Sequence, residues 1–344
     1  MVPTILIPAY NPDEKLQQTI RNLREAGYTQ FVVVDDGSRP DCWAIFDWVA
    51  QQEDILLLRH SVNCGKGRAM KTGFNEILCR KMAQNGVIVC DADGQHPIAA
   101  INSVAQQMLE HPDCLVLGVR KFFEADNVPL PNLLGNTITR GAFYLITGIR
   151  YGDTQCGLRG FPEPVIRQLM TVSGERFEYE NTMLLAVRSL GIPVCQVPME
   201  ALYLDDNKSS HFHRIHDSVR IYKTILGFAK RPFIAAILHF LLFYYLRSTF
   251  PTWWGPTAAY GIGLLAGYLF LLFSVPGVRK FKALAGAVVL TLAACALQFI
   301  LGTAGIPAMG AWWILALPLG LTSYYLWVGL CYGPRPLNYR LDLR

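Results

Sequence analysis

Residues 31–38 read FVVVDDGS, four β-favouring apolar residues followed by two acids, a glycine and a serine. The run of β-branched and aromatic residues predicts a buried strand, and the glycine with its polar neighbours predicts a turn at its end. The same order recurs at residues 87–97, where VIVC precedes DADGQHP. A buried strand that ends in a polar turn, repeated along the chain, favours an α/β protein.

Strands and helices alternate over roughly residues 1–206, which we expect to form one domain. Further strands are predicted at 3–8, 55–58, 115–119 and 194–198. Helical patterns separate the strands, at about 13–26, 41–52, 66–85, 98–110, 133–147, 163–171 and 179–190. This order predicts a Rossmann-like, mostly parallel sheet with helices on both faces. Ligands of such sheets bind beyond the carboxyl ends of the strands, so the candidate site residues follow each strand.

The charge of the chain is unevenly divided. The 344 residues carry 31 Lys and Arg against 26 Asp and Glu, a net charge of +5, with a mean hydropathy of +0.26. Residues 1–231 hold 24 basic and 25 acidic side chains, whereas the rest hold 7 and 1. This division excludes a disordered chain, a collagen-like chain and a basic nucleic-acid-binding body. We therefore expect no nucleic acid partner.

The last third of the chain is strongly apolar. Its runs at about 233–250, 254–275, 283–304 and 311–331 approach the roughly 20 residues that a helix needs to cross a membrane. The only charges from 233 to 333 are Arg247, Arg279, Lys280 and Lys282. A buried helical core would instead show charged outer faces. We expect a transmembrane domain of about four helices over 232–334.

The basic residues predict how this domain is oriented. They cluster before the first run, between the second and third runs, and after the fourth, so both ends are expected in the cytoplasm. Residues 207–231 hold six basic residues and one acid among apolar residues at helical spacing. This segment predicts an amphipathic interfacial helix, with a solvated linker helix as the alternative. The predicted protein is a multi-pass protein of the inner (cytoplasmic) membrane, with residues 1–206 in the cytoplasm and a cytoplasmic tail at 335–344.

The nine cysteines include no CxxC pair and show no metal-like spacing with histidine. We therefore expect neither a zinc site nor a disulfide framework, and a reduced, cytosolic location for the first part of the chain.

The two acidic turns and the segment between them offer phosphate chemistry. Asp91 and Asp93 stand one residue apart and can both reach one hard cation, Mg²⁺ or Mn²⁺, which would neutralise a diphosphate. Residues 63–73 read NCGKGRAMKTG, a glycine-rich turn that enters a helix, where amides and cations can hold phosphate. The turn lacks both the GxxxxGK[ST] and the GxGxxG patterns. Each feature alone is common in structural turns.

Four motifs in a fixed order carry a resemblance. IPAYN at 7–11, VVDDGS at 33–38, NCGKGRAMKTG at 63–73 and DADGQHP at 91–97 together resemble the family 2 glycosyltransferases of the GT-A fold. The resemblance covers roughly residues 1–230. It implies a hexosyltransferase that uses a nucleotide-sugar donor.

The resemblance also implies roles for single residues. In this interpretation Asp91 faces the ribose and the metal, and Asp93 with Gln95 holds Mg²⁺ or Mn²⁺ on the diphosphate. The residues implied at the nucleoside pocket are Pro8, Tyr10 and Asp36, supported by Lys66 and Arg68.

Later motifs look like the subgroup that uses polyprenyl-phosphate acceptors, the dolichyl-phosphate mannose synthase and bactoprenol glucosyltransferase type. These motifs are LGVRKF at 117–122, LLGNTITRGAFYLITG at 133–148, DTQCGLRGF at 153–161, GERFEYE at 174–180 and NKSSHF at 207–212. A lipid phosphate is already an anionic nucleophile, so the site needs cations that position it. Arg120, Arg140 and Arg159 are the candidates, because guanidinium groups match phosphate. Glu178 and Glu180 are expected to cap a helix or to orient Arg159.

The expected reaction is an inverting, metal-dependent transfer of a monosaccharide from a nucleotide sugar to a polyprenyl phosphate at the cytoplasmic leaflet. UDP-glucose is preferred as donor, with GDP-mannose next. A processive polysaccharide synthase shares the first four motifs but carries a QxxRW string, which this sequence lacks. A non-catalytic or flippase-like membrane protein with a vestigial transferase domain is a second alternative. A nucleotidyltransferase is a third, but it would leave the lipid-phosphate motifs and the apolar tail unexplained. The identity of the sugar and a homo-oligomeric state are left open.

Overall fold

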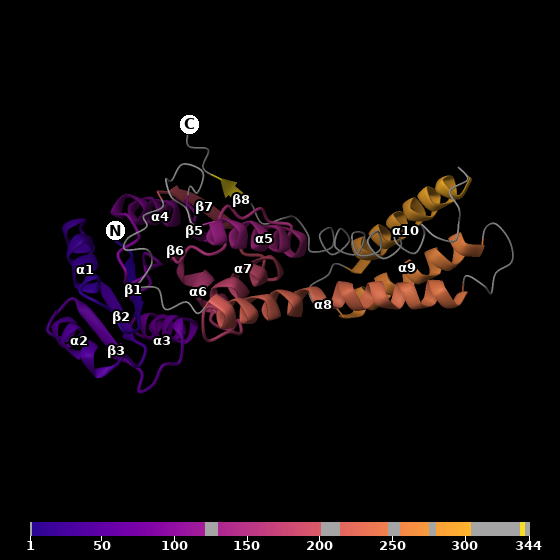
Figure 1. Cartoon of the computed structure of the whole chain (residues 1–344). Helices are drawn as coiled ribbons and strands as arrows, with labels where there is room; N and C mark the ends of the chain where they lie inside the picture. The colour runs from indigo at the N-terminus through magenta and orange to yellow at the C-terminus, as the bar shows by residue number, and fades with distance from the viewer. Residues whose placement is uncertain are drawn as a thin grey trace. The chain divides into compact units, whose positions relative to one another are not determined.

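The computed structural model describes residues 2–120, 130–200, 214–246, 255–274, 280–303 and 338–340. The chain divides into two compact units. The first comprises residues 1–144, 149–225 and 336–344, and the second comprises residues 145–148 and 226–335. Figure 1 shows a sheet with surrounding helices in the first unit and long helices in the second.

One eight-stranded sheet forms the centre of the first unit, in the order β3-β2-β1-β4-β6-β5-β7-β8. Only the two pairs that involve β6 are antiparallel, and all the others are parallel. The mostly parallel α/β fold predicted from the alternation is therefore confirmed. The strands are β1 Thr4–Ala9, β2 Phe31–Asp35, β3 Ile55–Arg59, β4 Val87–Val89, β5 Leu115–Arg120, β6 Arg159–Phe161, β7 Val194–Met199 and β8 Asn338–Arg340.

The helices around this sheet begin and end within three residues of the predicted ones, except that the helix predicted at 66–85 ends at Cys79. They are α1 Lys15–Glu25, α2 Trp43–Ala50, α3 Lys66–Cys79, α4 Ile98–Glu110, α5 Leu130–Thr147, α6 Glu163–Leu169 and α7 Glu178–Leu190, with a 3₁₀ turn at Pro40–Cys42. Only β6 and β8 were not predicted.

The central strands are apolar on both faces, as expected of a parallel sheet covered on both sides. On one face, Ile5 and Ile7 of β1 and Val33 of β2 lie in a cluster with the apolar residues of α1, α2 and α4. On the other face, Leu6 is so close to α3 that a Cβ on Gly73 would lie 2.3 Å from it. The ring of Phe74 in α3 packs edge-on against Phe161 of β6, with 5.0 Å between centroids. Helices thus cover both faces of the sheet.

Three further helices are α8 Arg214–Leu246, α9 Gly255–Ser274 and α10 Lys280–Thr303. The predicted boundary between an interfacial helix and a first span, at residue 231, falls inside α8, which continues through Pro232. Within the described residues, no helix combines the length with the apolarity that a membrane crossing requires. The fourth predicted span, 311–331, and the NKSSHF motif at 207–212 lie outside the described residues. The four spans stay a prediction.

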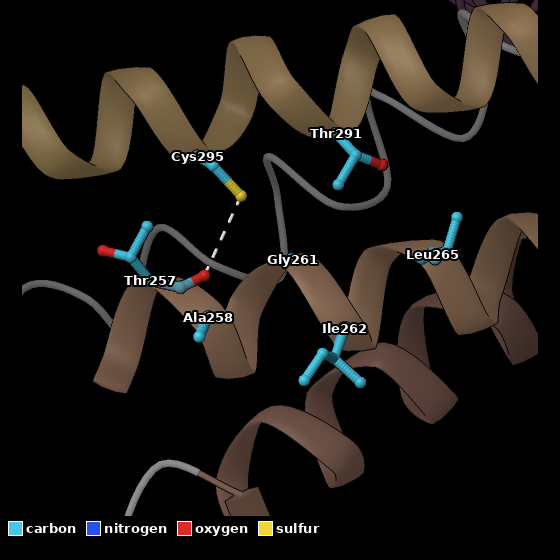
Figure 2. Close-up of a pocket in the computed structure, with 7 residues that line it drawn as sticks. All are labelled: Thr257, Ala258, Gly261, Ile262, Leu265, Thr291 and Cys295. Atoms are coloured by element: carbon cyan, nitrogen blue, oxygen red, sulfur yellow. Dashed lines mark hydrogen bonds between the residues drawn. The ribbon is translucent and has the colours of Figure 1, made fainter. Parts of the chain in front are cut away.

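In the second unit α9 and α10 pack closely, since a Cβ on Gly261 would lie 2.9 Å from the Cys295 sulfur. Beside this contact an open pocket of about 450 Å³ is lined by Thr257, Ala258, Gly261, Ile262, Leu265, Thr291 and Cys295. Figure 2 shows that the Cys295 thiol points across the pocket to the Thr257 carbonyl oxygen, 3.8 Å away.

Candidate active site

The sheet brings the predicted site residues to one edge. Because β1, β2, β4 and β5 run in the same direction, their carboxyl ends lie together. Asp36 follows β2, Asp91 follows β4, and Arg120 ends β5. Arg159 begins the antiparallel β6 and therefore reaches the same edge, where it pairs in register with Val89. These residues lie in one region, as we expected from their positions after the strands.

The first acidic turn is held by hydrogen bonds from distant residues. Asp36 is 2% exposed. Its Oδ1 accepts a hydrogen bond from the Cys64 backbone N–H at 2.9 Å and contacts His60 Nδ1 at 2.7 Å, and its Oδ2 accepts from the Gly65 N–H at 2.7 Å. The other ring nitrogen of His60 lies 2.9 Å from the Thr72 hydroxyl oxygen. Asp36 therefore fixes the start of the glycine-rich turn against the end of β2.

The end of β1 joins the same region. Pro8 is buried within β1 and pairs in register with Val34 of β2. The Asp36 N–H donates to the Ala9 carbonyl oxygen at 2.9 Å. Tyr10 follows the strand and is half-buried. The predicted nucleoside-pocket residues Pro8, Tyr10 and Asp36 thus lie on adjoining strand ends, while their contacts with a nucleotide stay a prediction.

The second acidic turn contains a buried charge network. Lys66 Nζ lies 2.7 Å from Asp91 Oδ1 and 3.1 Å from Glu180 Oε2. Burial by itself would raise the pKa of Asp91, but Lys66, His96 and Arg159 together outweigh this effect and lower the pKa to about 2. Gly157 leaves the room that Asp91 needs, because a Cβ at that position would lie 2.3 Å from Asp91 Oδ2. Asp91 is therefore an ionised carboxylate held in one place.

Asp93 differs from Asp91 in its charge environment. Its Oδ1 accepts a hydrogen bond from the Gln95 backbone N–H at 3.1 Å. Burial, followed by the negative charge of Asp91, raises the pKa of the Asp93 carboxyl to about 6. The raised pKa shows that the positive charge of Lys66 does not compensate for burial and for the Asp91 charge at Asp93.

The donors present here fit a divalent cation. Carboxylate and amide oxygens are the ligands that Mg²⁺ and Mn²⁺ prefer, and a bound cation would relieve the repulsion that raises the Asp93 pKa. Asp91 and Asp93 would supply two ligands, with Gln95 beside them, and would leave the rest of the coordination shell to a diphosphate and water.

The glycine-rich turn is closed by the segment 174–180. Gly65 has a φ of +105°, and a Cβ there would lie 2.6 Å from the Glu175 carbonyl oxygen. A Cβ on Gly67 would lie 2.5 Å from the Cβ of Tyr179. The two motifs touch so closely that only glycine fits at these positions.

Polar contacts strengthen this closure. The Arg68 N–H donates to the Glu175 carbonyl oxygen at 2.7 Å, and Arg68 Nε lies 2.5 Å from Glu175 Oε2. Lys71 Nζ donates to the Gly174 carbonyl oxygen at 2.8 Å. Arg176 Nη1 donates to Asn63 Oδ1 at 2.8 Å. Arg68, predicted to support the nucleotide, thus already binds the segment 174–180.

The three arginines predicted for the acceptor phosphate have different partners. Arg120 forms a two-point contact with the buried carboxylate of Asp153, at 2.7 and 3.3 Å. Arg140 Nε donates to the Tyr151 carbonyl oxygen at 2.9 Å. Arg159 is 1% exposed. Arg120 and Arg140 are partly accessible, whereas Arg159 is an interior residue, and a role in acceptor binding stays a prediction for all three.

Glu178 and Glu180 take structural positions. Arg159 donates to the Glu180 carbonyl oxygen at 2.7 Å, and its Nε lies 3.9 Å from Glu180 Oε1. Glu178 Oε1 accepts from the N–H groups of Glu175 and Arg176 in the turn before α7. The contact of Glu180 with Arg159 agrees with the predicted orienting role, and Glu178 holds the turn.

Sequence reasoning missed three contributors to this region: His60, Gly157 and Arg176. No local pattern marks His60 at the end of β3 as the partner of Asp36. Gly157 and Arg176 stand inside motifs that had been noted, DTQCGLRGF and GERFEYE, so those motifs were the only available signal.

One family model and several known proteins resemble parts of the chain. Residues 4–161 match the family model described as Glycosyl transferase family 2. A UDP-N-acetylglucosamine–dolichyl-phosphate N-acetylglucosaminyltransferase of Methanococcus voltae is 24% identical over 217 residues, covering 58% of this chain and 86% of the relative. An undecaprenyl-phosphate mannosyltransferase of Micrococcus luteus is 25% identical over 202 residues, covering 56% of this chain and 81% of the relative.

Among solved structures, glucosyl-3-phosphoglycerate synthase of Mycobacterium tuberculosis aligns with a TM-score of 0.46 and 15% identity, over 66% of this chain and 79% of that chain.

Proposed function

Residues 4–161 form a glycosyl transferase family 2 domain of the GT-A type, and from this premise we propose that the chain transfers a monosaccharide from a nucleotide sugar to a polyprenyl phosphate. The chain is a glycosyltransferase, and its relatives named above act on dolichyl or undecaprenyl phosphate. The proposal concerns the donor, the acceptor, the metal and the place of the reaction.

The observation that carries the proposal is the pair Asp91 and Asp93 beyond β4. One acid is ionised and held by Lys66, and the pKa of the other is raised to about 6 by burial and by the negative charge of Asp91. This arrangement suits a divalent cation that carries a diphosphate. When bound, Mg²⁺ or Mn²⁺ would act as a Lewis acid that stabilises the leaving diphosphate.

The chain's own residues would prepare the donor. Asp36 holds the glycine-rich turn through the N–H groups of Cys64 and Gly65, and Lys66 holds Asp91 in a fixed orientation. These contacts would keep the metal ligands and the nucleoside pocket of Pro8 and Tyr10 at a constant separation. A site positioned in advance lowers the barrier, because the groups need not reorganise during reaction.

The acceptor would need positioning more than activation. A phosphate monoester oxygen is already anionic at neutral pH and can attack the anomeric carbon in line, with inversion of configuration. The C1–O bond to the diphosphate breaks as the bond to the acceptor phosphate forms, and the products are a polyprenyl-phosphate monosaccharide and a nucleoside diphosphate. Arg120 and Arg140 are the accessible cations that would bind the acceptor phosphate.

The donor is proposed as UDP-glucose, with GDP-mannose next. The preference rests on the DTQCGLRGF and NKSSHF strings, which look more like those of bactoprenol glucosyltransferases. The two relatives named above transfer N-acetylglucosamine and mannose, so several nucleotide sugars belong in the test.

We propose that the reaction takes place at the cytoplasmic face of the inner membrane. The support is compositional: the region from 233 to 333 holds four charged residues, all basic. In this proposal that region anchors the chain through about four spans, and basic residues mark their cytoplasmic ends.

The test is an incubation of membranes that contain the full chain with radiolabelled UDP-glucose, GDP-mannose and UDP-N-acetylglucosamine, one at a time. Label in a chloroform-soluble product that mild acid releases is expected with one donor, in a reaction that EDTA stops and Mn²⁺ restores. Label in a polymer would point instead to a processive synthase. No label with any donor would favour a non-catalytic membrane protein and would refute the proposal.

A further inference from the structure

A second cluster of potential ligands lies at the other end of the sheet. The side-chain ligand atoms of His111, Cys114 and Cys195 all lie within 4.8 Å of one another. Both cysteines are fully buried, while His111 is half-buried. Two thiols and one imidazole, gathered within this distance, have the donor types and spacing of a tetrahedral zinc centre.

The backbone fixes the positions of these residues. His111 directly follows α4, and the Cys114 N–H donates to the His111 carbonyl oxygen at 3.1 Å, which closes a tight turn over His111–Cys114. Leu115, the next residue, pairs in register with Val194, and Val116 pairs with Cys195. A turn that presents two ligands three residues apart, with a third ligand on the neighbouring strand, is a chelating geometry built from regular structure.

We propose that His111, Cys114 and Cys195 bind one Zn²⁺ ion. Thiolate and imidazole donors select zinc over Mg²⁺ or Ca²⁺, which take oxygen ligands. Asp113 is exposed, and its Oδ1 lies 3.6 Å from the Cys114 sulfur, but its carboxylate does not belong to the group of mutually close ligand atoms, so the fourth position is left to another ligand. Water would complete the tetrahedron.

This zinc site would be structural. Cys114 immediately precedes β5 and Arg120 ends it, so six residues of strand, about 20 Å, separate the cluster from the acidic turns. The ion would join the end of α4 to the amino ends of β5 and β7. The proposal therefore does not depend on the proposed glycosyl transfer and can fail or hold independently of it.

The histidine distinguishes this proposal from a disulfide. A Cys114–Cys195 disulfide would use both sulfurs and exclude a metal ion, whereas the proposed site uses the His111 imidazole together with both thiolates. The spacing along the chain did not indicate a metal site, because Cys195 lies 81 positions beyond Cys114 and only the pairing of β5 with β7 brings them together.

The test measures zinc in the full chain, purified under reducing conditions without a polyhistidine tag. We expect about one zinc per chain by mass spectrometry. After removal of zinc, Co²⁺ should give a sulfur-to-cobalt charge-transfer band, which Zn²⁺ abolishes. Loss of a supporting residue typically costs about 10–100-fold in metal affinity, so C195S should lose at least about tenfold. Asp93→Asn should retain the band, since oxygen ligands do not produce it.

The matched control is Cys42→Ser, which changes another buried cysteine of the same core, outside the cluster. If Cys195→Ser does not fold, His111→Ala replaces a half-buried ligand and should lower the affinity for Co²⁺ by at least about tenfold. The proposal is overturned if the reduced wild type binds no zinc and gives no charge-transfer band. It is also overturned if Cys42→Ser weakens binding as much as His111→Ala, or if the purified chain carries a Cys114–Cys195 disulfide.

Discussion

The two acidic turns of this chain look alike in sequence and differ in structure. Both follow a buried strand, and both contain two acids, a glycine and a polar residue. In the first turn the Asp36 carboxylate is saturated by two backbone N–H groups and His60. In the second, Asp93 Oδ1 accepts a hydrogen bond from the Gln95 N–H, and the pKa of the Asp93 carboxyl is raised to about 6.

The difference comes from partners that lie far away in sequence. Asp36 meets a turn 28 residues later, whose N–H groups it satisfies, so its charge is used within the fold. In the second turn, Lys66 pairs with the Asp91 carboxylate, whereas the pKa of Asp93 stays raised. Asp93 is therefore the acid whose charge a ligand would offset. Asp36 therefore stabilises the structure of the site, whereas Asp91 and Asp93 would bind the ligand.

The sharpest test of the comparison is Asp93→Asn, for which we expect the largest effect. The amide keeps the size of the side chain and removes the charge that would bind the metal. Turnover should fall by at least about a hundredfold, the usual cost of removing one electrostatic contact to a transition state. The measurement is the initial rate of lipid-linked product at saturating donor, with Mn²⁺ titrated.

Asp47→Asn is the control, because Asp47 is an exposed acid that pairs only loosely with Arg59, at 3.4 Å. If Asp93→Asn kept near-normal turnover with the metal chelated, the assignment of Asp93 as a metal ligand would be wrong.

The second prediction concerns Asp36→Ala, which should act on stability. The change leaves the buried N–H of Gly65 and its neighbour at Cys64 without their acceptor. Hydrogen bonds to charged groups contribute about 1.5–3 kcal/mol each and are not additive, so we expect a loss of about 3 kcal/mol in the free energy of unfolding. Urea unfolding of the first unit, followed by fluorescence, measures it. Asp47→Ala should change this free energy by less than about 1 kcal/mol. Equal effects of the two variants would show that Asp36 does not hold the turn.

The third prediction tests how closely Asp91 is held. In Gly157→Ala the new Cβ would lie 2.3 Å from Asp91 Oδ2, so the carboxylate must move away from its contact with Lys66. A displacement of about 1 Å at a reacting site can cost up to about 100-fold, and we expect a fall of about tenfold in turnover. The apparent affinity for Mn²⁺ should fall as well. Gly141→Ala is the control, because nothing lies within 4 Å of a Cβ there. Unchanged Mn²⁺ affinity in Gly157→Ala would mean that Asp91 does not bind the metal.

Much of the fold followed from local patterns. The strands at 31–35 and 115–120 consist of apolar runs at 31–34 and 115–119, each followed by one charged residue, and the helices at 15–25 and 98–110 carry clear amphipathic spacing. The strand at 159–161 was missed because it has only three residues, one of them glycine, and is defined by its two neighbours. The change in charge density predicted a boundary at residue 231, but α8 is continuous there. Charge composition indicates the environment of a helix and does not determine where the helix ends.

The candidate site was predicted less completely than the fold. Motif order and strand ends brought Asp36, Asp91 and Asp93 to the correct edge of the sheet. The interaction between residues 63–71 and 174–180 was beyond reach, because it joins segments about a hundred positions apart through glycines and backbone oxygens. The same reason hid the pairing of Arg120 with Asp153. Contacts between residues far apart in the sequence decide which charged side chains are paired, and the type of each residue does not reveal them.

The smallest effect is expected for Arg176→Ala, which would loosen the closure of the glycine-rich turn. Arg176 donates to Asn63 Oδ1 at 2.8 Å and to the Asn63 carbonyl oxygen at 3.4 Å. A hydrogen bond of this kind contributes about 1 kcal/mol net, which corresponds to about a fivefold change in an equilibrium constant.

Because Asn63 adjoins the residues that bind Asp36, its release should raise the KM for the nucleotide sugar by about two- to fivefold and leave kcat unchanged. Steady-state kinetics at fixed acceptor, with the donor varied, separate the two constants. Arg167→Ala is the matched control, since Arg167 pairs on the surface of α6 with Glu163. If Arg176→Ala lowered kcat and left the KM for the donor unchanged, segment 174–180 would act in the chemical step. Its role would then not be limited to holding the glycine-rich turn.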